Sequence, residues 1–380
     1  MSYYYDEDVK KYGENVAPQL PWSIQLNPTY GCQRAPLKSK QRPDGSCKGG
    51  CNFCGVWSLI DKEKDTIEFR HMTVETATAI AKQLNEWVPK RRIEINNFGE
   101  PFLNPNIFGI IKALRDNYPS CCIQLQTNGV NCKNDYETFK DMSQKFFEAG
   151  GNMLVFDSYE GTYPIYLEFS KKFSEETGIG YIDYIYDNPD HVSYYANHGS
   201  DYQKIFVVED LEITSKGGTA RAIYNHAGNL NPEVFERYGI PVGELPMDKK
   251  CSRVFREIVI GYDGAVSMCC HDFRRQVILG KIPEDNIRDI WNSRAFNTLR
   301  KLLYDKDRTK IRPCNICSYP GGFRLGFIHR PEGEVSEEDF SDLLSLQQKY
   351  SDLIHFNGYA EINGVKVEST MKKLCDLKKD

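Results

Sequence analysis

The residues with the clearest chemical potential are cysteines, and the first cluster of them is CKGGCNFC. It places thiols at Cys47, Cys51 and Cys54 in a loop that contains glycine. A closed structural zinc site or an electron-transfer cubane takes four protein ligands, so three thiolates leave one metal position open for another molecule. A zinc site completed by a distant His or Cys is the alternative for this cluster.

A further thiol precedes this cluster. Cys32 ends the segment TYGC, and residues 33–46 separate it from Cys47. Cys32, Cys51 and Cys54 therefore form an alternative set of three ligands. Four other cysteines have no ligand-like spacing and are expected to pack in the core or to be incidental: Cys121, Cys122, Cys132 and Cys375.

The second cluster has four thiols. Cys251 and Cys269 flank an IGYDG segment, and PCNIC adds Cys314 and Cys317. Four thiolates are enough to close a metal site, but their spacing alone does not distinguish zinc from an iron–sulfur cluster. Cys270, next to Cys269, is an alternative ligand.

The elements that must position these cysteines alternate between strands and helices. Strand patterns cover 23–32, 92–99, 122–129 and 152–161, and apolar residues at helical spacing cover 73–88, 105–116, 135–149 and 165–177. This alternation predicts βαβ units and a parallel sheet, with the chemistry at the carboxyl ends of the strands. From about 245 the pattern changes to a hairpin, REIVIGYDGAVSMCC, and a helix over 286–303; an acidic helix and the hairpin YAEINGVKVE follow Pro331.

Composition sets limits on the class of protein. The 380 residues suffice for one α/β barrel with an appendage, and 40% hydrophobic and 27% charged residues are ordinary for a globular chain. Thirteen cysteines without an export signal indicate reduced thiols and metal ligands, so the protein is predicted to be cytoplasmic. No apolar run approaches the roughly 18 residues of a membrane span. The net charge of −5 argues against a chain built to coat nucleic acid.

Four motifs in the first half resemble those of the radical SAM superfamily. Besides the first cysteine cluster, FGEP is similar to the family's GGEP-type motif with Phe98 in place of glycine, and QTNG and DSYEG stand at the ends of later predicted strands. The resemblance implies a partial (β/α)6 TIM-like barrel. It also implies a [4Fe–4S] cluster on Cys47, Cys51 and Cys54 whose open iron is chelated by S-adenosylmethionine (SAM).

The same resemblance implies contacts with SAM. Phe53 would pack near the adenine, and the FGEP motif would bind the methionine amino group. TARAIYNHAGN resembles a segment at the last barrel strand, with His226 in place of an arginine, and offers Arg221 and Asn225 as SAM or substrate contacts. The implied cofactor-binding residues are Phe53, Gly99, Glu100, Pro101, Thr127, Asn128, Ser158 and Arg221.

The second cysteine cluster resembles the SPASM/twitch extension that follows many radical SAM barrels. The resemblance rests on Cys251, IGYDG, CCHD, LGKI, IWNS and PCNIC, and because the pattern stops at Cys317 the one-cluster twitch form matches better. It implies an auxiliary [4Fe–4S] cluster on Cys251, Cys269, Cys314 and Cys317, where Cys269 has the expected spacing from the hairpin glycine. The predicted domains are a radical SAM partial barrel (1–240), a SPASM/twitch-like hairpin-plus-helix domain (241–330), and a helix and hairpin appendage (331–380).

The resemblance implies an enzyme that reductively cleaves SAM to a 5′-deoxyadenosyl radical, which abstracts hydrogen from a substrate carbon. The auxiliary cluster would accept an electron during oxidation or bond remodelling, with a purely structural role as the alternative. Peptides, sugar-like and nucleotide-like molecules are the expected substrates, and flavodoxin or ferredoxin the expected reductant. The alternatives to an enzyme are an iron–sulfur electron carrier and a zinc-binding module. Four basic residues could attract an anionic substrate to the mouth of the site, although a solvated loop is the simpler interpretation: Arg34, Lys38, Lys40 and Arg42.

Overall fold

A computed structural model describes most of the chain. The described residues are 20–35, 37–41, 43, 51, 54–61, 64–88, 90–159, 161–185, 203–209, 225–230, 244–319, 321, 329–355 and 358–370.

A nine-stranded sheet forms the centre of the molecule, in the order β13-β12-β11-β1-β6-β7-β8-β10-β9. All neighbouring pairs from β11 to β9 are parallel, whereas β12 and β13 are antiparallel to their neighbours. The predicted α/β barrel sheet is therefore confirmed. The strands are β1 (Ser23–Leu26), β6 (Arg92–Ile95), β7 (Cys122–Thr127), β8 (Met153–Ser158), β9 (Gly180–Ile185), β10 (Lys204–Glu209), β11 (Glu257–Ile260), β12 (Ala265–Ser267) and β13 (Ile278–Lys281).

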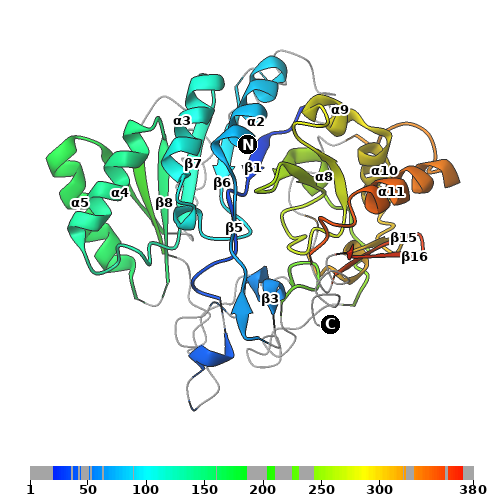
Figure 1. The fold of residues 1–380 in the computed structure, drawn as a ribbon, viewed down its shortest axis with the longest axis horizontal. Helices are drawn as coiled ribbons and strands as arrows, with labels where there is room; N and C mark the ends of the chain where they lie inside the picture. The colour runs from blue at the N-terminus through cyan, green and yellow to red at the C-terminus, as the bar shows by residue number, and fades with distance from the viewer. Residues whose placement is uncertain are drawn as a thin grey trace, which may run out of the picture.

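Four helices connect the parallel strands and follow one another in Figure 1 from α5 to α2 across the sheet. They are α2 (Val74–Trp87), α3 (Ile107–Asn117), α4 (Tyr136–Glu148) and α5 (Tyr163–Thr177). Thr73 begins α2 as predicted, because its side chain accepts a hydrogen bond from the Thr76 amide at 3.2 Å. The apolar face of α2, which includes Ile80 and Leu84, is buried.

The second module extends the barrel sheet. β11 pairs in parallel with β1, from Ser23 opposite Glu257 to Leu26 opposite Ile260, so the hairpin is continuous with the strands of the first module. Its helices are α8 (Arg253–Arg256), α9 (Ile287–Asn292) and α10 (Arg294–Tyr304). The prediction of one helix over 286–303 is wrong, because Ser293 has extended backbone angles and caps α10 by accepting from the Phe296 amide at 3.1 Å.

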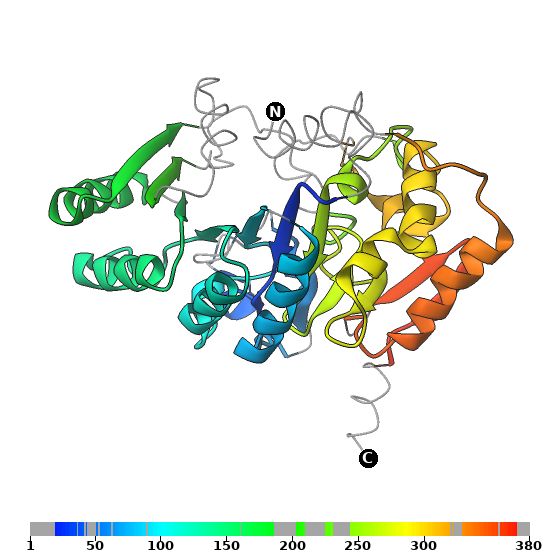
Figure 2. The ribbon, with the colours of Figure 1, turned by 90° about the horizontal axis from the view of Figure 1, so that it is seen from above.

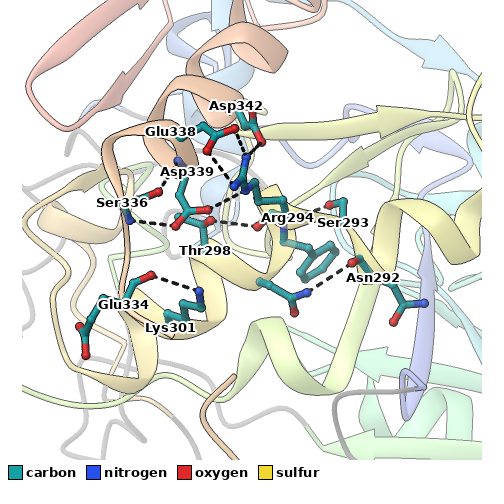
Figure 3. A network of polar contacts seen from close by, with 12 residues as sticks. Asn292, Ser293, Arg294, Thr298, Lys301, Glu334, Ser336, Glu338, Asp339 and Asp342 are labelled. Atoms are coloured by element: carbon teal, nitrogen blue, oxygen red, sulfur yellow. Dashed lines mark hydrogen bonds and ion pairs between the residues drawn. The ribbon is translucent and has the colours of Figure 1, made fainter. Parts of the chain in front are cut away.

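The C-terminal appendage packs against this module. It contains α11 (Glu337–Lys349) and the hairpin of β15 (Tyr359–Ile362) and β16 (Val365–Glu368), which pairs with β14 (Ile311–Arg312). In Figure 3, Arg294 of α10 forms ion pairs with Glu338 at 2.7 Å, Asp339 at 3.0 Å and Asp342 at 3.5 Å. Figure 2 shows the appendage, in orange and red, at the end of the molecule opposite α5 and β9.

Short elements lie between β1 and α2. They are β2 (Thr29–Tyr30), β3 (Ile60–Asp61), β4 (Thr66–Ile67), β5 (Arg70–His71) and a 3-10 helix over Gly55–Leu59. β2, which follows β1, pairs with β5, which precedes α2. None of the helices in the described ranges is both long enough and apolar enough to cross a membrane.

Candidate functional site

Two of the predicted motifs are joined at the carboxyl edge of the parallel sheet. The Gly31 amide donates to the Phe98 carbonyl at 3.0 Å, and the Glu100 amide donates to the Gly31 carbonyl at 3.1 Å. Glycine is required at position 99, because a Cβ there would lie 2.3 Å from the Gly31 oxygen and 2.5 Å from the Thr29 oxygen. This contact holds TYGC directly against FGEP.

Glu100 extends the network to QTNG. Its side chain is buried and accepts from the Thr127 hydroxyl at 2.7 Å, the Asn128 amide at 2.9 Å and the Phe102 amide at 3.2 Å. Burial raises the pKa of the Glu100 carboxyl, while the three donors act in the opposite direction. The carboxylate therefore fixes the ends of β6 and β7 relative to each other.

The thiol of Cys32 lies in this network and close to Cys51. The Asn128 side-chain amide and the Arg34 backbone amide each donate to the Cys32 sulfur at 3.4 Å. The Arg34 guanidinium donates to the Cys51 sulfur at 3.2 Å, and the Cys54 amide donates to the Cys51 carbonyl at 3.3 Å. Arg34 and the Cys51–Cys54 turn thus link the three cysteines near the edge where Glu100 holds the strand ends.

The surroundings of these thiols fit an anionic metal–thiolate centre. Burial raises the pKa of the Cys54 thiol to about 12 and also raises that of Cys32. Metal coordination would supply the positive charge that favours the thiolates. Amide and guanidinium donors are suited to the sulfurs of an iron–sulfur cluster.

Other predicted residues fall into two groups. Cys47, Phe53 and Arg221 lie outside the described residues. Pro101 is buried at the start of a 3-10 helix, and Ser158 ends β8 with a buried hydroxyl that has no hydrogen-bond partner among the described residues. A buried hydroxyl without a protein partner at this edge fits a ligand that would supply one.

The structure corrects the interpretation of the basic insertion. Arg34 does not face solvent at a mouth; it is buried, and its guanidinium contacts Cys51 and lies 5.3 Å from the centre of the Tyr159 ring. Lys40 donates to the carbonyls of residues 33 and 35 in its own loop. Lys38 is exposed, and Arg42 lies outside the described residues.

The four thiols of the second cluster line one narrow cavity. Cys251 precedes α8, Cys269 follows β12, and Cys314 and Cys317 bound a 3-10 turn; Cys270 does not line the cavity. The His271 amide donates to the Cys269 sulfur at 3.3 Å, and the Tyr319 amide to the Cys317 sulfur at 3.4 Å. Burial raises the pKa of the Cys317 thiol to about 11.

The four thiols line one cavity, and four is the number of ligands that a closed metal centre requires.

Asn225 has a role that the sequence did not reveal. Its side-chain amide donates to the Ile316 carbonyl at 2.5 Å and accepts from the Ser318 amide at 2.9 Å, and its backbone amide donates to the Ser318 hydroxyl at 2.8 Å. Asn225 therefore clamps the loop that carries Cys314 and Cys317, a role other than the SAM or substrate contact expected from the sequence.

Aromatic side chains link the two cysteine sites. The Phe98 and Phe273 ring centres are 5.0 Å apart, and Phe273 lies 5.6 Å from the His226 ring, which stacks on His271 at 5.2 Å. A Cβ on Gly55 would lie 2.4 Å from the Phe273 ring, so the loop after Cys54 also touches this ring. Burial, with Arg253 nearby, lowers the pKa of His226 to about 4, which keeps its imidazole neutral.

Comparisons with known proteins agree with the second of these sites and with the fold. Residues 251–318 match the SPASM family, described as an iron–sulfur cluster-binding domain. BtrN, solved in complex with AdoMet and 2-DOIA, is similar in structure with a TM-score of 0.52 and 18% identity, covering 78% of this chain and 93% of BtrN. No curated protein sequence matches the chain.

Two other solved structures are more distantly similar. anSMEcpe with bound AdoMet has a TM-score of 0.39 and 16% identity, covering 72% of this chain and 81% of its own. SuiB of Streptococcus suis bound to the precursor peptide SuiA has a TM-score of 0.37 and 14% identity, covering 76% of this chain and 69% of its own.

The fold and the matched domain agree with the predicted organisation. The chain combines a partial α/β barrel with a SPASM domain over 251–318. The fold is shared with BtrN, whose structure holds AdoMet. The predicted fold class is confirmed, and the SPASM match supports an iron–sulfur cluster in the second module.

Proposed function

We propose that this chain is a radical SAM enzyme whose first cluster binds SAM next to the ends of β1, β6 and β7. The observation that carries the proposal is the continuous hydrogen-bond network from Glu100 through Asn128 to the cysteines. When bound, the cluster and SAM supply a 5′-deoxyadenosyl radical, which takes hydrogen from a substrate carbon. The protein's own part is to bind, orient and exclude water.

Glu100 is suited to hold the amino group of SAM. A carboxylate has about four acceptor positions, and three are used by Thr127, Asn128 and Phe102, which leaves about one for an ammonium group. Ser158 offers a buried hydroxyl to the same ligand. The full proposed set of contacts is Phe53, Gly99, Glu100, Pro101, Thr127, Asn128, Ser158 and Arg221.

The second site is proposed to hold an auxiliary [4Fe–4S] cluster on Cys251, Cys269, Cys314 and Cys317. Four thiolates leave no iron open for substrate, so this cluster is suited to accept an electron. Arg308 lies at the cavity and donates to the carbonyls of residues 249 and 319. Its positive charge favours the reduced, more negative form of a cluster there.

The net reaction is proposed to be an oxidation or bond remodelling of a peptide, sugar-like or nucleotide-like substrate, with flavodoxin or ferredoxin as the reductant. The AdoMet in BtrN supports SAM as the cosubstrate of this fold. Arg34 no longer supports an anionic substrate, because its guanidinium is committed to Cys51 and Tyr159.

The test is SAM cleavage by the anaerobically purified protein. With dithionite as reductant, the intact chain should contain about eight iron atoms and release 5′-deoxyadenosine. A Cys51→Ala/Cys54→Ala variant should keep about four iron atoms and release none. Cys122→Ala is the matched control, because that buried thiol packs on Met153 within the sheet.

The same assay separates the competing functions. An iron–sulfur electron carrier would hold the iron but leave SAM intact. A zinc-binding module would be colourless and contain stoichiometric zinc. Release of 5′-deoxyadenosine by the double variant at the wild-type rate would contradict the assignment of the first cluster.

A further inference from the structure

We infer that Cys32, and not Cys47, is the third cysteine ligand of the SAM-binding cluster, together with Cys51 and Cys54. The inference rests on the proposed function and goes beyond the spacing of the cysteines, which favours Cys47. If correct, the residues between the first and second ligands are 33–50, so a long insertion interrupts the binding motif.

Arg34 joins the two thiols that are far apart in the sequence. Its backbone amide donates to the Cys32 sulfur at 3.4 Å, and its Nε donates to the Cys51 sulfur at 3.2 Å. Its carbonyl accepts from the Cys51 amide at 3.1 Å. Three separate groups of one residue therefore hold the Cys51 segment next to Cys32.

Cys54 is held near Cys32 and Cys51 by different contacts. Cys32 and Cys54 both pack against one apolar cluster that includes Tyr30, Phe98 and Phe273. Cys54 is also tied to Cys51 through the hydrogen bond from its amide to the Cys51 carbonyl at 3.3 Å. Arg34, the Cys51–Cys54 turn and the shared apolar cluster thus keep the three cysteines in one neighbourhood.

Cys32 is also attached to the proposed SAM contacts. It directly follows Gly31, whose amide and carbonyl bond the Phe98 carbonyl and the Glu100 amide. The Asn128 side chain donates to its sulfur at 3.4 Å. A cluster held by Cys32 would therefore lie beside the residues proposed to bind SAM.

Two N–H groups donate to the Cys32 sulfur, the Arg34 backbone amide and the Asn128 side-chain amide, both at 3.4 Å. Hydrogen bonds to ligand sulfurs stabilise and tune iron–sulfur clusters. The Arg34 guanidinium would add a positive charge beside the cluster, which favours its reduced form.

The test compares Cys32→Ala and Cys47→Ala in the full chain. Both variants are reconstituted anaerobically with ferrous iron and sulfide, and iron content and the electron paramagnetic resonance (EPR) spectrum of the reduced protein are measured. Cys32→Ala should hold about four iron atoms and Cys47→Ala about eight. The matched control is Cys132→Ala, a buried thiol that donates to the Gly129 carbonyl just beyond β7.

Loss of iron by Cys47→Ala would overturn the inference, whatever Cys32→Ala does. Cys47→Ala therefore decides the question alone if Cys32→Ala does not fold, and the far-ultraviolet circular dichroism spectrum shows whether it does. Cys51→Ala separates the two proposals. If Cys51→Ala loses about four iron atoms while Cys32→Ala keeps all, the inference fails and the proposed function stands. If Cys51→Ala keeps all its iron, the proposed function fails.

Discussion

Gly99→Ala probes the backbone contact that joins the first two motifs. The new methyl group would lie 2.3 Å from the Gly31 oxygen and 2.5 Å from the Thr29 oxygen. Both obstacles are backbone atoms, so no side chain can rotate away to make room. The segment after β1 must therefore move away from the end of β6.

The size of the effect follows from what that movement breaks. It disrupts the two hydrogen bonds between Gly31 and residues 98 and 100, at 3.0 and 3.1 Å, each of which contributes about 1 kcal/mol. Overpacking in a dense region costs about 1–3 kcal/mol more. We expect the free energy of unfolding to fall by about 3–5 kcal/mol. Cys32 follows Gly31, so iron binding at the first cluster should weaken as well.

The assay is anaerobic urea unfolding combined with iron content. Gly180→Ala is the matched control, because the nearest atom to its added Cβ is Lys204 Cε at 3.9 Å. The control should change the free energy of unfolding by no more than about 0.5 kcal/mol. If Gly99→Ala were as stable as the control and kept all its iron, the proposed packing of TYGC against FGEP would be refuted.

Three further predictions concern the second module and the appendage. Asn225→Ala leaves two partly buried backbone groups, of Ile316 and Ser318, without their partner, so a chelator should remove about half of the iron faster than from wild type. An unchanged rate would count against the clamp. Cys269→Ala should lose the auxiliary EPR signal while Cys270→Ala keeps it, and the reverse pattern would reassign the ligand. Burial, with Arg274 nearby, lowers the pKa of His355 to about 3. Between about pH 6.5 and 3 the unfolded chain therefore binds a proton that the folded chain does not. The free energy of unfolding falls as the pH drops through this range, by up to about 1.4 kcal/mol per pH unit. His355→Gln should reduce this slope in thermal unfolding, while the exposed His329→Gln should not, and equal slopes would show that His355 does not contribute.

Local patterns predicted most of the elements. The capping Thr73 and the spacing of apolar residues placed α2, and the Asn-Gly pair placed the hairpin of β15 and β16, whose Asn363 and Gly364 both have positive φ. Each of these features depends on a few residues that are adjacent in the chain, so a single sequence is enough to predict it. Cys121, Cys122 and Cys132 are buried, as expected for packing thiols.

Contacts between distant segments could not be predicted in this way. Neither the pairing of β11 with β1 nor the clamp of Asn225 on the loop near residue 317 has a local signature. Arg34 was misjudged for the same reason, since an arginine in a polar loop is usually solvated and its contact with Cys51 arises from the fold. The helix break at Ser293 differs from these cases because it has a local signature: a serine within a helical pattern can cap the start of a new helix.

The proposed function requires two different clusters in the chain, one open to SAM and one closed. The EPR spectrum of the reduced protein with and without SAM, in Cys51→Ala/Cys54→Ala and in Cys314→Ala/Cys317→Ala, distinguishes them. SAM should change the spectrum of the second variant and leave that of the first unchanged. A SAM-dependent change in the first variant, or none in the second, would contradict the proposed function.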